Sequence, residues 1–243
     1  MKFPASLPAR MLAGLLACVT ATAANATGMP LVAELFTSQG CSSCPPADAL
    51  LGELAREPDV IALAFHVQYW DGLGWDDRFG MPEASKRQQA YVQGLRLSGA
   101  YTPQLIVNAE HNLLGSNRAQ LHALLPVLRR QRGSGVAIVA SRSPGMLDIA
   151  LPALAGEPSE VEVLLLAVRS QADTAIGRGE NSGRTLREFN IVRAVRVLDR
   201  LHGMAAQYHV PTASLPLDAD QAVILLQDIR QGALRGALQL PLR

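Results

Sequence analysis

The first half of the chain alternates between short apolar, β-branched runs and segments with helical spacing of their apolar residues. Between residues 31 and 132 this pattern predicts four strands and three helices in the order β-α-β-α-β-β-α. The predicted strands are residues 31–37, 60–67, 104–108 and 111–114, and the predicted helices are residues 47–56, 82–95 and 117–132. The first strand-helix-strand unit favours a parallel pair of strands with a right-handed crossover.

The second half has a different pattern. From Gly135 onward, β-prone runs follow one another and are separated by Pro/Gly breaks such as Pro144-Gly145. The runs are residues 136–141, 146–151, 161–168, 189–197 and 222–227. We therefore expect a β-rich, sandwich-like subdomain that packs on the first half.

The first 26 residues have the pattern of an export signal. Lys2 and Arg10 precede or flank an apolar stretch, and the segment ends in the small residues Ala24-Asn25-Ala26. Removal of this signal peptide would leave the protein in the periplasm or secreted, in an oxidising compartment. The string Leu15-Leu16-Ala17-Cys18 also matches a lipobox, so a lipidated Cys18 stays an alternative.

The charge balance argues against two classes of partner. The whole chain has 22 Lys and Arg against 21 Asp and Glu, a formal net charge of +1. Without residues 1–26, which contain Lys2 and Arg10, the balance is 20 minus 21, or −1. Such a balance does not indicate a nucleic acid or an anionic membrane as partner. No run of 18 apolar residues follows the signal, so we expect no membrane span.

The clearest chemical motif is Cys41-Ser42-Ser43-Cys44, which lies directly between the first predicted strand and the first predicted helix. At a helix start, backbone N–H groups and the helix dipole stabilise a thiolate. A second sulfur three residues later can then displace a mixed disulfide. We predict a redox-active dithiol in which Cys41 is the nucleophile, and the more exposed of the two, and Cys44 is the resolving thiol.

Other uses of this motif stay open. The bond between Cys41 and Cys44 could be an inert structural disulfide, for which an even number of exported cysteines also suffices. A zinc site needs a second close pair of Cys or His ligands, which the sequence does not offer. Cys41, Cys44 and His66 together could be soft ligands for Cu(I). His66 ends a predicted buried strand, where it is a core residue, a proton relay or a metal ligand.

Residues 31–132 resemble the thioredoxin superfamily. In these folds a dithiol begins the first core helix, and a cis-proline begins the third core strand beside it. Cys41, Cys44 and Thr102-Pro103 stand at the matching places. The resemblance implies a thioredoxin-like fold with Pro103 next to the thiols, where a proline at the first residue of a strand is sterically permitted.

A narrower resemblance is carried by several strings along the chain. They are residues 35–48, Phe65-His66-Val67, Tyr69-Trp70-Asp71, Leu73-Gly74-Trp75 and Tyr101-Thr102-Pro103-Gln104. These strings are similar to a family of exported bacterial proteins that is catalogued as a domain of unknown function. In that family an aspartate usually follows His-Val, whereas this chain has Gln68. Such a resemblance implies a fold but not an activity.

Taken together, we expect an α/β protein in which a thioredoxin-like fold is followed by a β-rich sandwich-like subdomain. The expected parts are a signal peptide at residues 1–26, a thioredoxin-like domain at 27–133 and the β-rich subdomain at 134–243. The expected function is that of an exported thiol-disulfide oxidoreductase acting on protein thiols or disulfides, with Cys41, Cys44 and Pro103 as site residues and no metal or cofactor. The alternatives are a copper-binding protein and a non-catalytic module with a structural disulfide.

A glycine-rich segment, residues 177–185, interrupts the β-rich half. It is not a P-loop, because Arg178 stands where the first glycine is needed and Arg184 where the lysine is needed. Two interpretations stay open: a solvated connection between strands, or a loop that lines the cleft beside the dithiol.

Overall fold

A computed structural model of the chain describes residues 28–154, 160–229 and 232–243. The expected signal peptide, residues 1–26, and its Cys18 lie outside the described residues. No helix in the described part is both long enough and apolar enough to cross a membrane.

The first half folds in the predicted order. The strands are β1 (Leu31–Thr37), β2 (Val60–His66), β3 (Gln104–Val107) and β4 (His111–Leu114), and the helices are α1 (Pro45–Leu54), α2 (Pro82–Gly94) and α3 (Arg118–Gln131). Helix α1 starts two residues earlier than predicted, because Pro45 and Pro46 occupy its first turn, where a backbone N–H has no helical partner to lose.

The second half contains more strand than predicted. Its strands are β5 (Val139–Ser143), β6 (Met146–Leu151), β7 (Val161–Ala175), β8 (Thr185–Leu201), β9 (Ala206–Pro211), β10 (Gln221–Asp228) and β11 (Leu234–Pro241), with a short 3-10 turn η1 (Thr212–Ser214). Strands β9 and β11 were not predicted. Buried and half-buried residues alternate in β11, and β9 has one buried residue, Val210, so neither forms a continuous apolar run.

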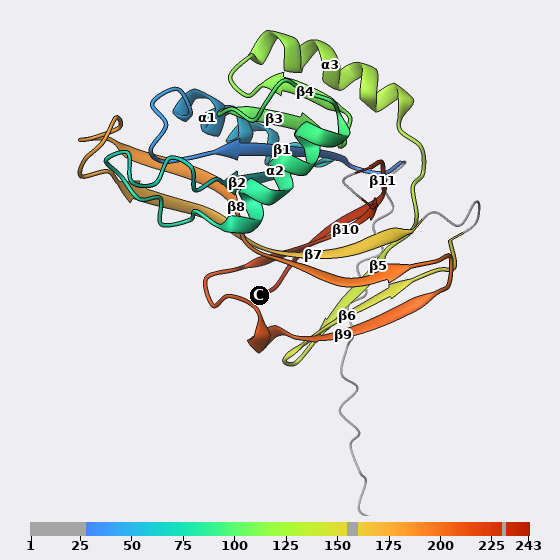
Figure 1. Cartoon of the computed structure of the whole chain (residues 1–243). Helices are drawn as coiled ribbons and strands as arrows, with labels where there is room; N and C mark the ends of the chain where they lie inside the picture. Colours follow the sequence, from blue (N-terminus) through green and yellow to red (C-terminus); the bar gives the residue numbers. More distant parts are fainter. Residues whose placement is uncertain (1–27, 155–159, 230–231) are drawn as a thin grey trace, which may run out of the picture.

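Two sheets result, and the larger one unites both halves of the chain (Figure 1). Its order is β11-β10-β7-β8-β2-β1-β3-β4. Strand β2 lies between β1 and β8, both of which run parallel to it, and the other pairs are antiparallel. Strands β5, β6 and β9 form the smaller sheet. The chain is therefore a mixed α/β protein, and four strands of the C-terminal half extend the sheet of the first half. The sequence analysis did not anticipate this continuity.

Three large apolar cores and one small one, of Phe79, Ala172 and Ile191, hold the layers together. Helices α1 and α3 cover one face of β1 to β4, and α2 packs on the opposite face of the sheet, in a core that also contains residues of β7 and β10. The smaller sheet packs on β7, β10 and β11. Strand β7 serves two cores because its side chains alternate: Val163 and Leu165 face the smaller sheet, whereas Leu164 and Leu166 face the α2 side.

A buried ion pair joins β1 to α2, and a hydrogen bond connects it to the second half. Glu34 of β1 accepts two hydrogen bonds from the Arg87 guanidinium of α2. Arg87 Nη2 also donates to Gln227 Oε1 of β10 at 2.9 Å and to Tyr91 Oη at 3.0 Å. These four side chains are buried. The two charges compensate each other once β1 and α2 are in place, and Gln227 of β10 accepts a further hydrogen bond from Arg87.

We predict that Arg87→Met strongly destabilises the protein. The substitution keeps most of the apolar volume but leaves the Glu34 carboxylate buried without a cation, a change that costs about 3–5 kcal/mol. Urea unfolding at pH 7 measures the loss. The matched control is Arg118→Met, which breaks the exposed pair with Glu53 and should change the unfolding midpoint little. Similar small losses in both variants would show that the buried pair contributes little to the stability of the fold.

Candidate functional site

Cys41 and Cys44 form a disulfide where β1 passes into α1, as their positions in the sequence indicated. Residues 38–44, called here the dithiol loop, make a tight turn in which the Cys41 N–H donates to Ser38 O and the Cys44 N–H donates to Cys41 O. Cys44 is the N-cap residue of α1. The prediction that Cys41 is the more exposed cysteine was wrong: both cysteines are fully buried, while Ser42 and Ser43 between them are exposed.

Pro103 lies beside the same helix. The Thr102–Pro103 peptide bond is cis, and Pro103 directly precedes β3. A Cβ added at Gly115 would come within 3.1 Å of both Pro103 Cβ and Ala47 Cβ of α1, so the three residues are in close contact. Pro103 therefore lies near the first turn of α1, which begins after its N-cap residue Cys44.

A tryptophan connects the dithiol loop to Thr102. The connection between β2 and α2, residues 67–81, is called here the tryptophan loop. Its Trp70 donates from Nε1 to Thr102 Oγ1 at 2.8 Å. A Cβ added at Gly40 would lie 3.2 Å from Trp70 Cβ, so only a small residue fits at that point of the dithiol loop. Trp70 therefore contacts both the dithiol loop and the segment that carries Pro103.

Gln39 of the dithiol loop is buried, and its backbone N–H and both ends of its side-chain amide are hydrogen-bonded. Its backbone N–H donates to Asp77 Oδ2 at 2.8 Å, and its Oε1 accepts from Trp75 Nε1 at 3.0 Å. Its Nε2 lies 2.9 and 3.0 Å from the two Glu188 oxygens and 3.1 Å from Thr174 Oγ1. The partners come from the tryptophan loop and from strands β7 and β8, so both halves of the chain determine the shape of the dithiol loop.

Four ionisable side chains lie buried beside this network. His66 Nδ1 is 2.7 Å from Asp77 Oδ2 and 3.8 Å from Glu188 Oε1. Asp48, four residues after Cys44 on α1, accepts a hydrogen bond from Thr37 Oγ1 at 2.8 Å. His66 Nε2 has no hydrogen-bond partner among the described residues. Three carboxyl groups and one imidazole therefore share a space from which water is largely excluded.

This environment changes the proton affinity of each group. Burial raises the pKa of Asp48 to about 7, although the charge of His66 opposes the change. Burial disfavours a charged His66, but the charge and hydrogen bond of Asp77 outweigh it and raise the His66 pKa to about 9. Burial likewise raises the pKa of Glu188, whereas His66 holds the pKa of Asp77 below its usual range despite burial. The cluster can thus hold or release a proton near neutral pH.

The connection between β7 and β8, residues 176–184, is called here the glycine loop, and it lies against the dithiol loop. Asn181 donates from Nδ2 to Gln39 O at 2.9 Å and to Cys41 O at 3.0 Å. Glu180 Oε2 accepts from the Ser42 N–H at 3.0 Å. Of the two interpretations left open by the sequence, the structure supports the loop that lines the dithiol. The glycine-rich pattern indicated this loop but not these two residues, because both contacts join positions about 140 residues apart.

The glycine loop also touches the tryptophan loop. A Cβ added at Gly179 would lie 3.1 Å from Trp75 Cβ, and one added at Gly74 would lie 3.1 Å from Gly179 Cα. Gly179 has φ +79°, a conformation that only glycine adopts readily. The two loops therefore meet beside the disulfide, at a contact that tolerates no side chain at Gly179.

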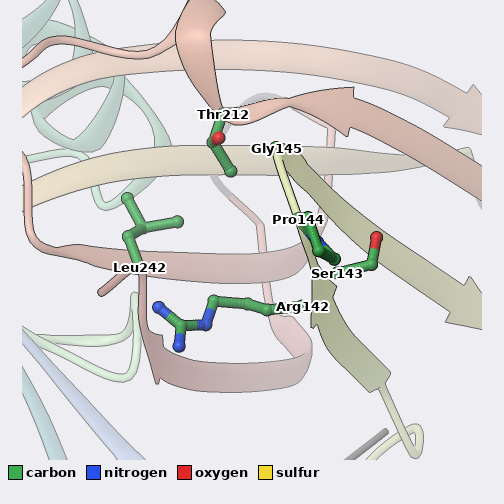
Figure 2. Close-up of a pocket in the computed structure, with 6 residues that line it drawn as sticks. All are labelled: Arg142, Ser143, Pro144, Gly145, Thr212 and Leu242. Atoms are coloured by element: carbon green, nitrogen blue, oxygen red, sulfur yellow. The ribbon is translucent and has the colours of Figure 1, made fainter. Parts of the chain in front are cut away.

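Other parts of the molecule were candidates for binding. No group of three His, Cys, Asp or Glu side chains in residues 28–154, 160–229 and 232–243 is placed to hold a metal ion. A cavity of about 370 Å³ lies in the C-terminal half, where the β5–β6 turn meets the chain after β11 (Figure 2). It is lined by Arg142, Ser143, Pro144, Gly145, Thr212 and Leu242, none of which belongs to the dithiol loop.

We predict that the stability of the oxidised protein falls between pH 5 and pH 9. The raised pKa of Asp48 adds stability that is complete below about pH 4 and is lost as the pH rises through about 7. The raised pKa of His66 adds stability that is complete below about pH 6.5 and is lost as the pH rises through about 9. Asp48→Asn keeps an acceptor for Thr37 but cannot ionise, so it should remove about 2 kcal/mol of the loss between pH 5 and pH 8.

Urea unfolding at a series of pH values measures both curves. Glu110→Gln is the control, since Glu110 is exposed at the turn between β3 and β4. The assignment fails if the wild-type curve is flat over this range, or if Asp48→Asn loses stability as steeply as the wild type.

Comparison with solved structures places this arrangement among known folds. The chain is similar to a crystal structure of protein AGR_C_4864 from Agrobacterium tumefaciens, with 26% sequence identity and a TM-score of 0.75, over 88% of this chain and 94% of that one. It is also similar in fold to HBP35 of Porphyromonas gingivalis, with 14% identity and a TM-score of 0.55, over 88% of this chain and 75% of that one. No curated protein matches the sequence. A protein-family model matches residues 32–227.

Proposed function

The chain belongs to the family described as "Protein of unknown function (DUF1223)", and we propose that it is a thiol-disulfide oxidoreductase whose active pair is Cys41 and Cys44. The observation that carries the proposal is the disulfide at the start of α1. It lies near Pro103 and near the buried cluster of ionisable side chains. A disulfide at a helix N-terminus opens to a thiolate that the helix end stabilises.

The arrangement of the first half supports a thioredoxin-like fold as part of this proposal. Strands β1 and β2 are parallel, β3 pairs antiparallel with β1, and β4 pairs antiparallel with β3 at the edge of the sheet. Helices α1 and α3 share one core on one face of these strands, and α2 packs on the opposite face. This is the order of elements on which the resemblance to the thioredoxin superfamily rests, with the C-terminal strands added at the β2 edge.

The proposed reaction exchanges one disulfide for another. In the reducing direction, the Cys41 thiolate attacks a substrate disulfide, a Cys41–substrate bond forms, and one substrate sulfur leaves and takes up a proton. Cys44 then loses its proton and attacks Cys41, which forms the Cys41–Cys44 bond and releases the second substrate sulfur as a thiol. Two electrons pass to the substrate, together with one proton from Cys44 and one from solvent. The oxidising direction reverses each step.

The buried ionisable cluster supports proton movement during this exchange. Cys44 must lose its proton to attack, and Asp48 lies one helical turn further along α1, so its side chain shares that side of the helix. A carboxyl with a pKa of about 7 is present in both protonation states at neutral pH, which suits an acceptor and donor of protons. Asp48 and His66 thus supply a group that can take this proton and return it.

A second candidate, a structural disulfide, is favoured by one observation. Both cysteines are fully buried, and a bond that serves only to stabilise the loop has no need of exposure. For exchange with a protein substrate, the structure around the sulfurs must open. We place the oxidoreductase first because a purely structural bond gives no reason for Asp48, His66 and Glu188 to lie buried together next to it.

The proposal includes the place of action and the partners. Export by the N-terminal segment would bring the pair into a compartment where disulfides form and persist. The partners would be cysteines of other exported proteins, and the Cys41–Cys44 pair would act without a metal or cofactor.

We predict that the two cysteines behave differently when each is replaced alone. The probe is a peptide with one cysteine that is joined to glutathione by a disulfide. Cys44→Ser leaves Cys41 to attack with no resolving thiol, so a mixed disulfide should accumulate and be visible as an added mass after an acid quench. Cys41→Ser should accumulate at least about tenfold less, since the Cys41 sulfur has a hydroxyl partner, Ser43 Oγ at 3.3 Å, that can donate to its thiolate.

The double variant with both cysteines replaced by serine is the control for other nucleophiles. Equal accumulation in the two single variants would reject the roles assigned to Cys41 and Cys44. No accumulation in either variant, with both proteins folded, would favour the structural disulfide.

A further inference from the structure

A carboxylate that no catalytic step uses lies on the dithiol loop. Glu180 of the glycine loop accepts a hydrogen bond from the Ser42 N–H at 3.0 Å, directly after Cys41. Hydrogen bonds from the Ser42 hydroxyl and from its backbone N–H hold the pKa of the Glu180 carboxyl below its usual range, so the group is ionised at neutral pH. The contact comes from a segment that is 138 residues away in the sequence.

The position of this charge matters for the sulfur of Cys41. Covalent geometry keeps the Cys41 sulfur within about 5 Å of the Ser42 nitrogen, so the Glu180 oxygen and the sulfur are within about 8 Å of each other. Like charges at this separation, about one Debye length at physiological ionic strength, disfavour each other. Glu180 also occupies the Ser42 N–H, next to Cys41, which could otherwise donate a hydrogen bond to the Cys41 thiolate.

Other charges near Cys41 do not cancel this effect by direct contact. Asp48 and Glu188 are acids of the buried cluster, and the charged His66 of that cluster is paired with Asp77. The nearby cations of the glycine loop contact other groups: Arg184 donates to Asn181 Oδ1, and Arg178 lies 3.8 Å from Asp76. Glu180 is the one charged side chain of the described residues recorded as hydrogen-bonded to the dithiol loop between the two cysteines.

We propose that Glu180 is a positioning residue that sets the reactivity of the pair: its carboxylate, held on the Ser42 N–H, lowers the thiolate fraction of Cys41 and so favours the disulfide. This inference rests on the proposed oxidoreductase function. Asn181 keeps Glu180 in place by binding the Gln39 and Cys41 carbonyls in the same loop. Movement of the glycine loop would take this charge away from Cys41.

The test compares wild type with Glu180→Gln, which keeps an oxygen acceptor for the Ser42 N–H and removes only the charge. In a Cys44→Ser background, iodoacetamide measures the thiolate of Cys41 alone. We expect the pH profile of alkylation to move to lower pH and the rate at pH 7 to rise about threefold. In about 1 M salt, where charges are screened, the two proteins should react at nearly the same rate.

The intact dithiol gives the second readout. Oxidised protein and two glutathione molecules are in equilibrium with reduced protein and one glutathione disulfide, and Glu180→Gln should shift this equilibrium toward reduced protein. Glu110→Gln removes an equally exposed charge far from the dithiol loop and should change neither readout. Glu180→Gln with wild-type alkylation at low salt, or with a difference that salt does not reduce, would overturn the inference. A wild-type pair that does not exchange with glutathione would instead refute the proposed function, while the alkylation difference would still decide the role of Glu180.

Discussion

The hydrogen bonds of Gln39 are the constraint on which the site depends. A buried amide that loses its partners is costly, so Gln39 stabilises the fold only when its partners are in place. Two of them, Thr174 and Glu188, lie on strands of the C-terminal half, and Trp75 and Asp77 lie in the tryptophan loop. The dithiol loop therefore takes its observed shape only after the two halves have joined.

The continuity of the large sheet supports the same site. Strand β8 pairs with β2 through Ala64 and Ile191, next to the strand end that carries His66. Further along, Phe189 of β8 packs so closely on α1 that a Cβ at Gly52 would lie 2.4 Å from its ring. The C-terminal half thus completes both the packing of α1 and the polar environment under the disulfide, which gives a physical reason why one chain holds both parts.

Several features were readable from the sequence because they depend on local chemistry. Apolar runs and helical spacing predicted β1 to β4 and α1 to α3 to within a few residues, and the dithiol position followed from the same pattern. The family and the disulfide are confirmed. The strands β9 and β11, the extension of the large sheet and the burial of Cys41 depend on long-range packing. Asn181 and Glu180 reach the dithiol loop only through the fold, so no local pattern could identify them.

The central claim is that the Cys41–Cys44 pair is a working redox pair and not a permanent link. The reduction potential of the wild-type protein, measured by equilibration with glutathione, tests it most directly. The account predicts a potential between about −270 and −120 mV, the range of dithiol oxidoreductases. A potential below about −300 mV, typical of structural disulfides, would contradict it.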